Sequence, residues 1–480
     1  MKMTAIKFSR LFTILLTIAI ISMLSQSCKS RVRKTRSFNI DEPIDTAHVI
    51  AYTAVKHPDW SKNLSIYEAN IRQFTFGGTF KEFESVLPKI QQLGVGIIWL
   101  MPIHPIGKIK RKGTLGSYYS VQDYYGINPE FGSMDDFKRL VDEIHKLGMY
   151  VIIDWVANHT AWDNNLINEH PEWYTRDIER KFQSPVKDWS DVADLNYNHN
   201  KLQDYMIDAM KFWVETTDID GFRCDVASMV PIEFWERSRQ ELDKVKAVFM
   251  LAEAENPEFH QRAFDMTYSW RVYKSLKSIA IGESGKYLQS LESVIDQDTT
   301  DYMIHSYRMQ FTSNHDENSW QNSAVNIFGD ALDVCTILNY TIPGMPLIYN
   351  GQEVGSKKML KFFAKDIIDW KKSPYRQFYT KLNNLKRNNL AIWNGEYGGN
   401  FQRILNSRDN YVYTFKRRKI RDKVMVMANL SGEKQKFNLR LNIPNGEFTD
   451  IFTGEKVTFN NIDEFELGPW GYKVFEQKRN

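Results

Sequence analysis

The residues best suited to chemistry in this chain lie in one short run, residues 221–227 (GFRCDVA). Its ionisable side chains, Arg223 and Asp225, alternate along what should be a strand, where side chains point to opposite faces with a period of two. Both would therefore share one face, and the guanidinium would hold the carboxylate ionised and oriented, as a nucleophilic aspartate requires. An isolated Arg-x-Asp pair would equally suit a structural ion pair at a sheet edge.

Three other stretches have the same build, an apolar run that ends abruptly in polar and ionisable residues. They are residues 150–159 (YVIIDWVANH), 248–253 (VFMLAE) and 309–316 (MQFTSNHD). Near-continuous apolar runs of this length are typical of strands buried on both faces, as in parallel sheets. A (β/α)8 barrel keeps its chemistry at the carboxyl ends of such strands, so four of these runs together predict a barrel active site.

The rest of the chain predicts the elements that would position these residues. Strands are expected at 64–70, 95–101 and 346–349, with one strand ending at Asp154, and helices at 80–93, 134–147 and 375–389. Strands that alternate with helices favour parallel βα units. The sequence therefore predicts an α/β fold, a (β/α)8 TIM barrel with a short insertion domain after strand 3 and a C-terminal antiparallel β domain.

The motifs resemble those of the α-amylase family, glycoside hydrolase family 13. The resemblance rests on DWVANH at 154–159, GFRCDVAS at 221–228, AE at 252–253, SNHD at 313–316, YSVQDY at 119–124 with FG at 131–132, and GMPLIYNGQE at 344–353. These motifs occur in the family's order between about residues 60 and 390. The resemblance implies a TIM barrel and activity on α-glucosidic bonds.

Retaining glycoside hydrolysis needs a nucleophilic carboxylate and a carboxylic acid about 5–5.5 Å apart. Two neighbouring carboxyls do not both ionise readily, so one pKa rises. Arg223 favours Asp225 as the ionised member, whereas Glu253 ends an apolar run without a basic neighbour in sequence and suits the proton donor. The family resemblance implies the same roles.

The resemblance also implies the supporting groups. Asp316 matches the third carboxylate, which binds sugar hydroxyls, while His159 and His315 match histidines that donate hydrogen bonds to the reactive sugar. Tyr119 matches the aromatic platform beneath that sugar, and Arg223 belongs to the substrate-binding set. Taken singly, His159 would also suit a helix cap or a metal ligand, and Asp316 a helix cap.

A calcium site is a further expectation from the resemblance. Asn158 and Asp194 match family ligands, and the carbonyl of Met229 would be a third. Oxygen donors of this kind suit Ca²⁺. Several relatives keep the asparagine without binding a metal, so calcium stays open, and no organic cofactor is expected.

Two departures from the family pattern concern the substrate. Ser228 and Met229 stand where many endo-acting amylases carry Lys-His, and residues 317–320 (ENSW) lack the arginine typical of oligosaccharide α-glucosidases. The leading hypothesis is a retaining hydrolase acting on α-glucan or maltooligosaccharide. The alternatives are a transglycosylase or isomerase using the same intermediate, and a non-catalytic α-glucan-binding protein, which the presence of all three acids disfavours.

The amino-terminal region predicts export. A basic start precedes the apolar stretch 11–24, so residues 1–27 are expected to be a signal peptide. Residues 24–28 (LSQSC) resemble a loose lipoprotein box, in which Cys28 would be lipidated and attach the protein to a membrane, and residues 28–58 would form a flexible tether. The expected location is the bacterial periplasm or outer membrane; plain secretion is the alternative.

Composition agrees with a globular, multi-domain protein. Hydrophobic residues make up 42% and charged residues 25% of the chain, and the net charge of +3 gives no reason to expect a nucleic-acid partner. Besides Cys28 only Cys224 and Cys335 remain, which suit core positions better than a disulfide framework. The expected domains are the barrel at 59–390 with its insertion at 155–199, and a β-sandwich-like domain at 391–480, in a monomeric protein.

Overall fold

The computed structural model describes residues 55–282, 287–460 and 462–478. The signal peptide, Cys28 and most of the expected tether therefore lie outside the described residues. Within the described part, no helix combines the length and apolar character needed to cross a membrane.

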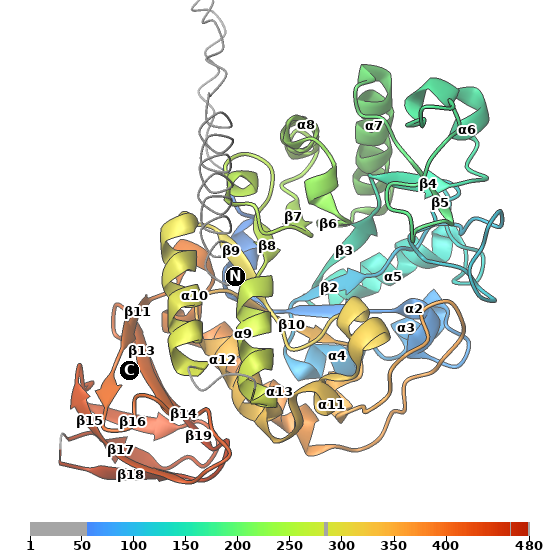
Figure 1. Ribbon diagram of the computed structural model, residues 1–480. Helices are drawn as coiled ribbons and strands as arrows, with labels where there is room; N and C mark the ends of the chain where they lie inside the picture. The colour runs from blue at the N-terminus through green and yellow to red at the C-terminus, as the bar shows by residue number, and fades with distance from the viewer. Residues whose placement is uncertain (1–54, 283–286, 461, 479–480) are drawn as a thin grey trace, which may run out of the picture. The chain divides into compact units, whose positions relative to one another are not determined.

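Eight parallel strands form a closed barrel in the order β1-β10-β9-β8-β7-β6-β3-β2 (Figure 1). Their bounds are β1 Ile66–Ala69, β2 Ile97–Leu100, β3 Tyr150–Trp155, β6 Gly221–Cys224, β7 Phe249–Ala252, β8 Met266–Tyr268, β9 Tyr307–Gln310 and β10 Met345–Tyr349. Almost every residue in these strands is buried, which agrees with their continuous apolar runs. The predicted fold class is confirmed.

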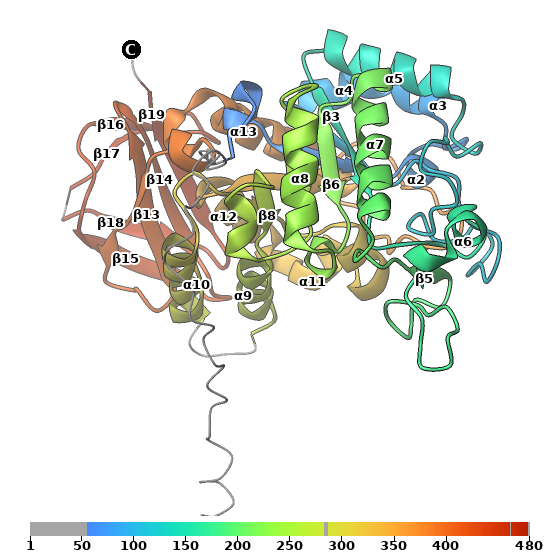
Figure 2. The same cartoon turned by 90° about the horizontal axis from the view of Figure 1, so that it is seen from above.

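Helices connect the strands and cover the outside of the barrel (Figure 2). The longer ones are α5 Met134–Lys146, α7 Asn200–Thr217, α8 Ile232–Asp243, α9 Trp270–Ile281, α10 Tyr287–Asp301, α12 Leu332–Thr341 and α13 Pro374–Asn388. The shorter ones are α2 Ile71–Phe74, α3 Phe80–Glu84, α4 Leu87–Leu93 and α11 Ala324–Phe328. Helix α5 begins with a reciprocal capping box between Ser133 and Asp136, which satisfies free N–H groups of its first turn.

The prediction of a single helix at 80–93 is wrong. The segment forms two helices, α3 Phe80–Glu84 and α4 Leu87–Leu93. Pro88 lies in the first turn of α4, where its missing N–H is tolerated, whereas inside a longer helix it would remove a hydrogen bond and clash with the preceding turn. The proline therefore favours a break followed by a new start.

The insertion after β3 carries a small antiparallel pair, β4 His159–Ala161 and β5 Val192–Asp194, with the short helix α6 Leu166–Glu169 between them. His159 pairs with Asp194 in this ladder. The side-chain hydroxyl of Ser120 donates to the carbonyl of Asp191 at 3.0 Å, so the insertion is joined to the loop that follows β2.

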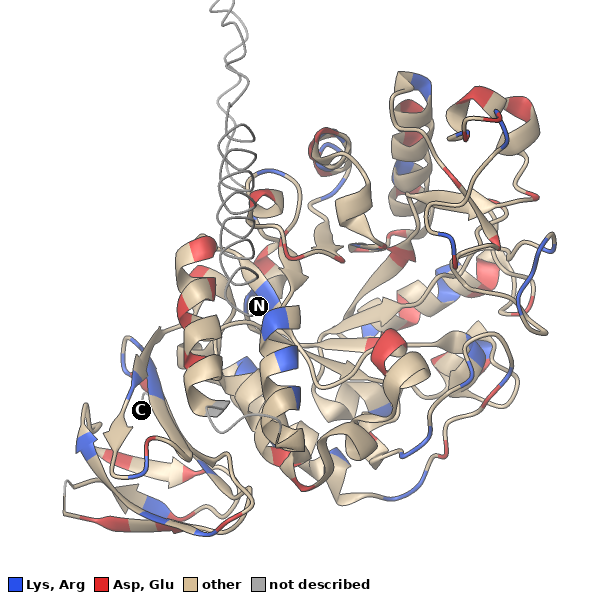
Figure 3. Ribbon diagram, viewed as in Figure 1, with Lys and Arg blue, Asp and Glu red and all other residues tan. Residues whose placement is uncertain are grey.

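After α13 the chain forms two antiparallel sheets, with strand orders β11-β13-β14-β19-β16-β17 and β12-β15-β18. Their bounds are β11 Asn400–Arg403, β12 Leu405–Asn406, β13 Val412–Lys419, β14 Asp422–Asn429, β15 Gln435–Leu441, β16 Glu447–Asp450, β17 Lys456–Thr458, β18 Glu464–Leu467 and β19 Tyr472–Gln477. Arg417 of β13 donates to the carbonyls of Thr341 and Ile342 at the end of α12, which connects these sheets to the barrel. Figure 3 shows acidic and basic residues interspersed over both parts.

Candidate active site

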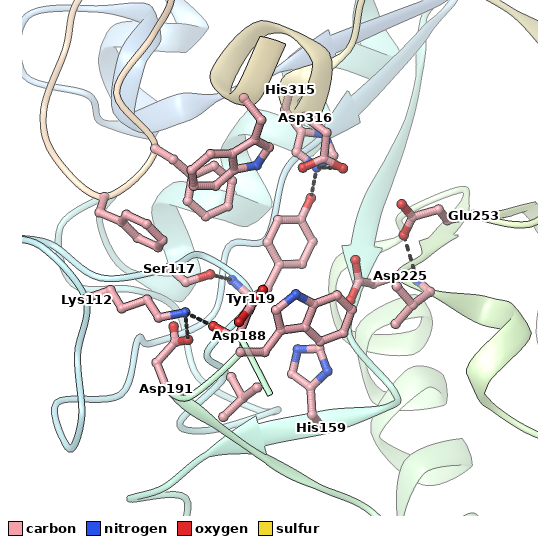
Figure 4. Close-up of a pocket in the computed structure, with 16 residues that line it drawn as sticks. Lys112, Ser117, Tyr119, His159, Asp188, Asp191, Asp225, Glu253, His315 and Asp316 are labelled. Atoms are coloured by element: carbon pink, nitrogen blue, oxygen red, sulfur yellow. Dashed lines mark hydrogen bonds and ion pairs between the residues drawn. The ribbon is translucent and has the colours of Figure 1, made fainter. Parts of the chain in front are cut away.

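Three acidic side chains from separate strands meet in one cavity of about 550 Å³ (Figure 4). Asp225 follows β6, Glu253 follows β7, and Asp316 lies beyond β9, immediately before the short helical segment Glu317–Gln321. All are at the carboxyl ends of barrel strands, where a (β/α)8 barrel presents its loops. His159, His315 and Tyr119 line the same cavity.

Arg223 connects the acids beneath the cavity floor. Its Nη1 lies 2.9 Å from Oδ1 of Asp225 and 2.8 Å from Oδ1 of Asp154, and its Nη2 lies 2.8 Å from Oε2 of Glu253. The guanidinium is fully buried, so these carboxyls replace its hydration. Glu253 thus has a basic neighbour in space, which its sequence context did not reveal.

The two acids that share this guanidinium have shifted pKa values. Burial raises the pKa of Asp225 well above its usual range and outweighs the charge of Arg223, so the expectation that this arginine alone keeps Asp225 ionised is not met. Burial also raises the pKa of Glu253, again against the effect of Arg223, and the N–H of Val226 donates to its Oε2 at 2.7 Å. Two close carboxyls with raised pKa values suit a pair that holds one proton between them.

His315 is held between acids and Tyr119. Its Nδ1 lies 2.5 Å from Oε1 of Glu68, its Nε2 lies 2.8 Å from the hydroxyl of Tyr119, and Oδ2 of Asp316 is 3.4 Å from Nε2. Burial lowers the pKa of His315, but the charges of Asp316 and Glu68 outweigh it and raise the pKa to about 9. His315 is therefore an imidazolium at neutral pH.

His159 has the opposite character. It lies on β4 with its ring 5.6 Å from that of Trp189, and burial lowers its pKa to about 4. The cavity therefore contains one cationic and one neutral histidine at neutral pH. A neutral imidazole still offers one N–H donor to a sugar hydroxyl.

Tyr119 is fixed by its hydroxyl and its ring. The hydroxyl donates to Oδ2 of Asp154 at 3.0 Å, and the ring stacks near His315 with centroids 5.4 Å apart. The ring of Phe362 is nearly parallel to that of Tyr119, with centroids 6.2 Å apart and an interplanar angle of 10°. The tyrosine is thus held rigidly at the edge of the cavity.

Two of the expected calcium ligands, Asn158 and Asp194, lie on paired segments of the insertion. The N–H of Leu195, next to Asp194, donates to the carbonyl of Asn158 at 3.1 Å, so Asn158 and Asp194 lie on neighbouring backbone segments. Met229 ends the short helical segment Ala227–Met229, where its N–H donates to the carbonyl of Val226 at 2.8 Å. Asn158 and Asp194 offer oxygen donors of the right kind, but two side chains are fewer than the about six to eight oxygens that calcium takes.

No group of three or more His, Cys, Asp or Glu residues among those described has an arrangement that could hold a metal ion. Burial raises the pKa of Asp194, and a hydrogen bond with the side chain of Thr175 only partly opposes this. The structure therefore supplies a partial donor set for calcium.

Several residues in and beneath the cavity were not identified from the sequence. Glu68 and Asp154 are fully buried acids within strands, and Lys112, Phe362 and Phe363 come from long loops. A charged residue inside an apolar strand is a signal that could have indicated the first two. Nothing local in the sequence places the loop residues at the cavity.

A closed parallel barrel with paired acids at the carboxyl ends of its strands defines the class of barrel glycoside hydrolases. Two family models agree: the α-amylase catalytic domain matches residues 52–190 and 187–388, and the α-amylase C-terminal all-β domain matches residues 404–471. The chain belongs to the α-amylase family, glycoside hydrolase family 13, and is an α-amylase-type glycoside hydrolase.

Individual relatives cover most of the chain. α-Amylase 2 of Dictyoglomus thermophilum is 25% identical over 86% of this chain and 75% of its own length. A cyclomaltodextrin glucanotransferase of Niallia circulans is 26% identical over 80% of this chain and 59% of its own. The crystal structure of a noncanonic maltogenic α-amylase from Thermotoga neapolitana superposes with a TM-score of 0.79 at 31% identity, covering 87% of this chain and 99% of that one. Both hydrolases and a transferase are thus among its relatives.

Proposed function

We propose that the protein is a retaining hydrolase that cleaves α-glucosidic bonds in starch-derived poly- or oligosaccharides. The observation that supports this most strongly is the convergence of Asp225, Glu253 and Asp316 in one cavity. The names of the relatives, α-amylase and maltogenic α-amylase, support an α-glucan as substrate.

In the first step Glu253 donates its proton to the glycosidic oxygen as the bond to the anomeric carbon breaks. Asp225 attacks that carbon from the opposite face and forms a glycosyl ester. Burial raises the pKa values of both carboxyls, so the pair can keep a proton at neutral pH, and the family resemblance, rather than the pKa values, assigns that proton to Glu253. Arg223, which contacts both carboxyls, would steady the proton-sharing pair while charge moves between its members.

In the second step Glu253, now ionised, takes a proton from water, and the resulting hydroxide equivalent attacks the anomeric carbon. The bond to Asp225 breaks, and the sugar leaves with its original configuration. Asp316 and the two histidines would bind hydroxyls of the reacting sugar, and Tyr119 would support its ring.

The test uses the purified protein with maltooligosaccharides and starch, and follows the anomeric configuration of the first products by NMR. We expect α-configured products; β-configured products would contradict the mechanism. The change Glu253→Gln should lower kcat by about 10²–10⁴-fold while substrate still binds, because it removes the proton donor and little volume. Glu258→Gln is the matched control, since Glu258 is exposed and outside the cavity.

Transfer to a sugar hydroxyl instead of water is the second candidate, favoured by the similarity to a cyclomaltodextrin glucanotransferase. The two differ only in what attacks the glycosyl ester. Chromatography of the products of maltotriose decides between them: products larger than the substrate indicate transfer, and only smaller ones indicate hydrolysis.

A further inference from the structure

The position of Glu253 in the barrel defines two ends of the cavity. In the circular strand order, β7, which Glu253 follows, is diametrically opposite β1, and β1 lies between β2 and β10. Under the proposed function, the leaving part of the substrate lies on the side of Glu253, because that residue protonates its oxygen. The part of the glucan that stays bound as the glycosyl ester must therefore extend toward the loops after β2 and β10.

Those two loops are joined above β1. The N–H of Leu115, in the loop after β2, donates to the carbonyl of Phe363, in the loop after β10, at 2.9 Å. The rings of Phe362 and Phe363 are 5.0 Å apart, and that of Trp320, from the segment after Asp316, lies 5.2 Å from Phe362. Aromatic rings packed at these distances form a stable surface. They line the cavity on this side.

Lys112 joins the same loop to the insertion. Its Nζ lies 2.5 Å from the carbonyl oxygen of Asp188 and 3.0 Å from Oδ1 of Asp191. Asp191 is only 5% exposed and its carbonyl accepts from Ser120, so the acceptor end of this bridge is fixed. Figure 4 places Lys112, Asp188 and Asp191 across the cavity from Glu253, with Tyr119 between the two groups.

We propose that these contacts form an end wall, made by Lys112, Asp188, Asp191, Trp320 and Phe363, and that the enzyme acts on the non-reducing ends of α-glucans. This inference rests on the proposed function and adds to it the mode of attack. A glucan that enters with its scissile oxygen at Glu253 meets the wall after a short run of sugars, so only a chain terminus can be accommodated there. An enzyme that cuts within chains needs a groove open at both ends.

The wall also has the chemistry to recognise a terminus. The ammonium of Lys112 and the carboxylates of Asp188 and Asp191 offer charged donors and acceptors, and hydrogen bonds to charged groups are the stronger ones. The free hydroxyls of a terminal glucose, at carbons 4 and 6, present both donors and acceptors to such groups. A terminal sugar substituted at these positions would lose the bonds and clash with the wall.

The test compares two substrates, p-nitrophenyl α-maltoheptaoside with a free terminal glucose and the same compound with that glucose capped by a 4,6-O-ethylidene group. Cleavage is followed by chromatography of all p-nitrophenyl-bearing products, because removal of sugars from the free end releases no p-nitrophenol. We expect the purified protein to cleave the free substrate with a kcat/KM at least about 100-fold above that for the capped one. Equal cleavage of both would overturn chain-end action and leave the proposed hydrolase intact. Cleavage of neither would overturn the proposed hydrolase, and this inference with it.

A variant tests the wall itself. Lys112→Ala removes the bridge to the insertion, so the ratio of capped to free cleavage should rise at least about tenfold. Lys110→Ala is the matched control, because Lys110 is on the same loop but its Nζ lies 3.4 Å from the centre of the Trp162 ring, and it is not among the cavity residues. A ratio that is the same in Lys112→Ala as in Lys110→Ala, with both variants folded by circular dichroism, would show that Lys112 does not close the cavity.

Discussion

Glu68→Gln is the sharpest available test of the electrostatics beneath the cavity. Glu68 is fully buried, and its Oε1 lies 2.5 Å from Nδ1 of His315. Glutamine keeps the shape and an oxygen acceptor for the imidazole N–H, but it removes the negative charge. The variant therefore separates the charge of Glu68 from its role in orienting the ring.

The size of the effect follows from the pKa of His315, which is raised from 6.5 to about 9. At about 1.4 kcal/mol per pKa unit, this shift corresponds to about 3 kcal/mol in favour of the imidazolium. Burial opposes the shift, and Asp316 contributes to it together with Glu68. Removing one of these two charges should lower the pKa of His315 by about 1–2 units.

The direction of the pH dependence follows from the difference between the folded-state and unfolded-state pKa values of His315. Because the folded-state pKa of His315 is above its unfolded value, the stabilisation it provides is complete below about pH 6.5 and is lost as the pH rises through about 9. If the imidazolium is the active form, the alkaline limb of the kcat/KM profile should follow the same ionisation. In Glu68→Gln we expect that limb, and the alkaline loss of thermal stability, to move about 1–2 pH units lower.

The assay is the pH dependence of kcat/KM on maltotriose, with thermal unfolding measured in parallel from pH 5 to 10. Glu353→Gln is the matched control, since Glu353 is equally buried and accepts a hydrogen bond from Tyr67 at 2.5 Å, but does not contact His315. An alkaline limb that stays within about 0.3 units of the wild type in Glu68→Gln would refute the role of the Glu68 charge.

Three further predictions concern stability, calcium and export. Gly221→Ala should destabilise the protein by at least about 2 kcal/mol, because Gly221 has a φ of +150° and an added Cβ would lie 1.9 Å from the carbonyl oxygen of Phe249. Gly148→Ala is the control: Gly148 has a φ of +72° and nothing within 4 Å of an added Cβ, so this variant should lose less Tm than Gly221→Ala. We propose that calcium binds through Asn158 and Asp194, so added CaCl₂ should raise the Tm of the wild type and leave that of Asp194→Asn unchanged, whereas an equal rise in both would contradict it. We also propose that Cys28 carries a lipid, so Cys28→Ala should move the expressed protein from the membrane fraction to the soluble exported fraction, and a distribution identical to the wild type would count against lipidation.

Regular patterns in the sequence were enough to predict the barrel. Residues 221–227 and 248–253 each combine a buried strand with an acid at its end, and a closed parallel barrel brings such ends together. Local pattern was less reliable for helix bounds, since the hydrophobic spacing at 80–93 continues through the break before Pro88. Pro88 is the residue that indicates a break in the helix. Where the break falls depends on where the second helix starts, which the hydrophobic spacing does not show.

The contacts between loops could not be predicted in the same way. The bond from Lys112 to Asp191 joins two irregular segments 79 residues apart, and the bond from Leu115 to Phe363 joins segments 248 residues apart. Loop conformations of this kind follow from tertiary packing rather than from local periodicity. The acids that act on the substrate were therefore easier to identify than the residues proposed to limit its length.

The balance of charge around Arg223 explains why the site needs several acids. Arg223 and the imidazolium of His315 face a larger number of carboxyl groups, which are Glu68, Asp154, Asp225, Glu253 and Asp316. Burial, together with the charges of neighbouring carboxylates, raises the pKa of most of these acids, so the site does not ionise all of them at neutral pH. A proton retained by Glu253 relieves the excess negative charge. When Glu253 gives that proton to the leaving oxygen, the site gains a negative charge as the sugar ring gains positive character. The enclosed acids thus stabilise the charge that develops in the transition state more than they stabilise the neutral substrate, which is the condition for catalysis.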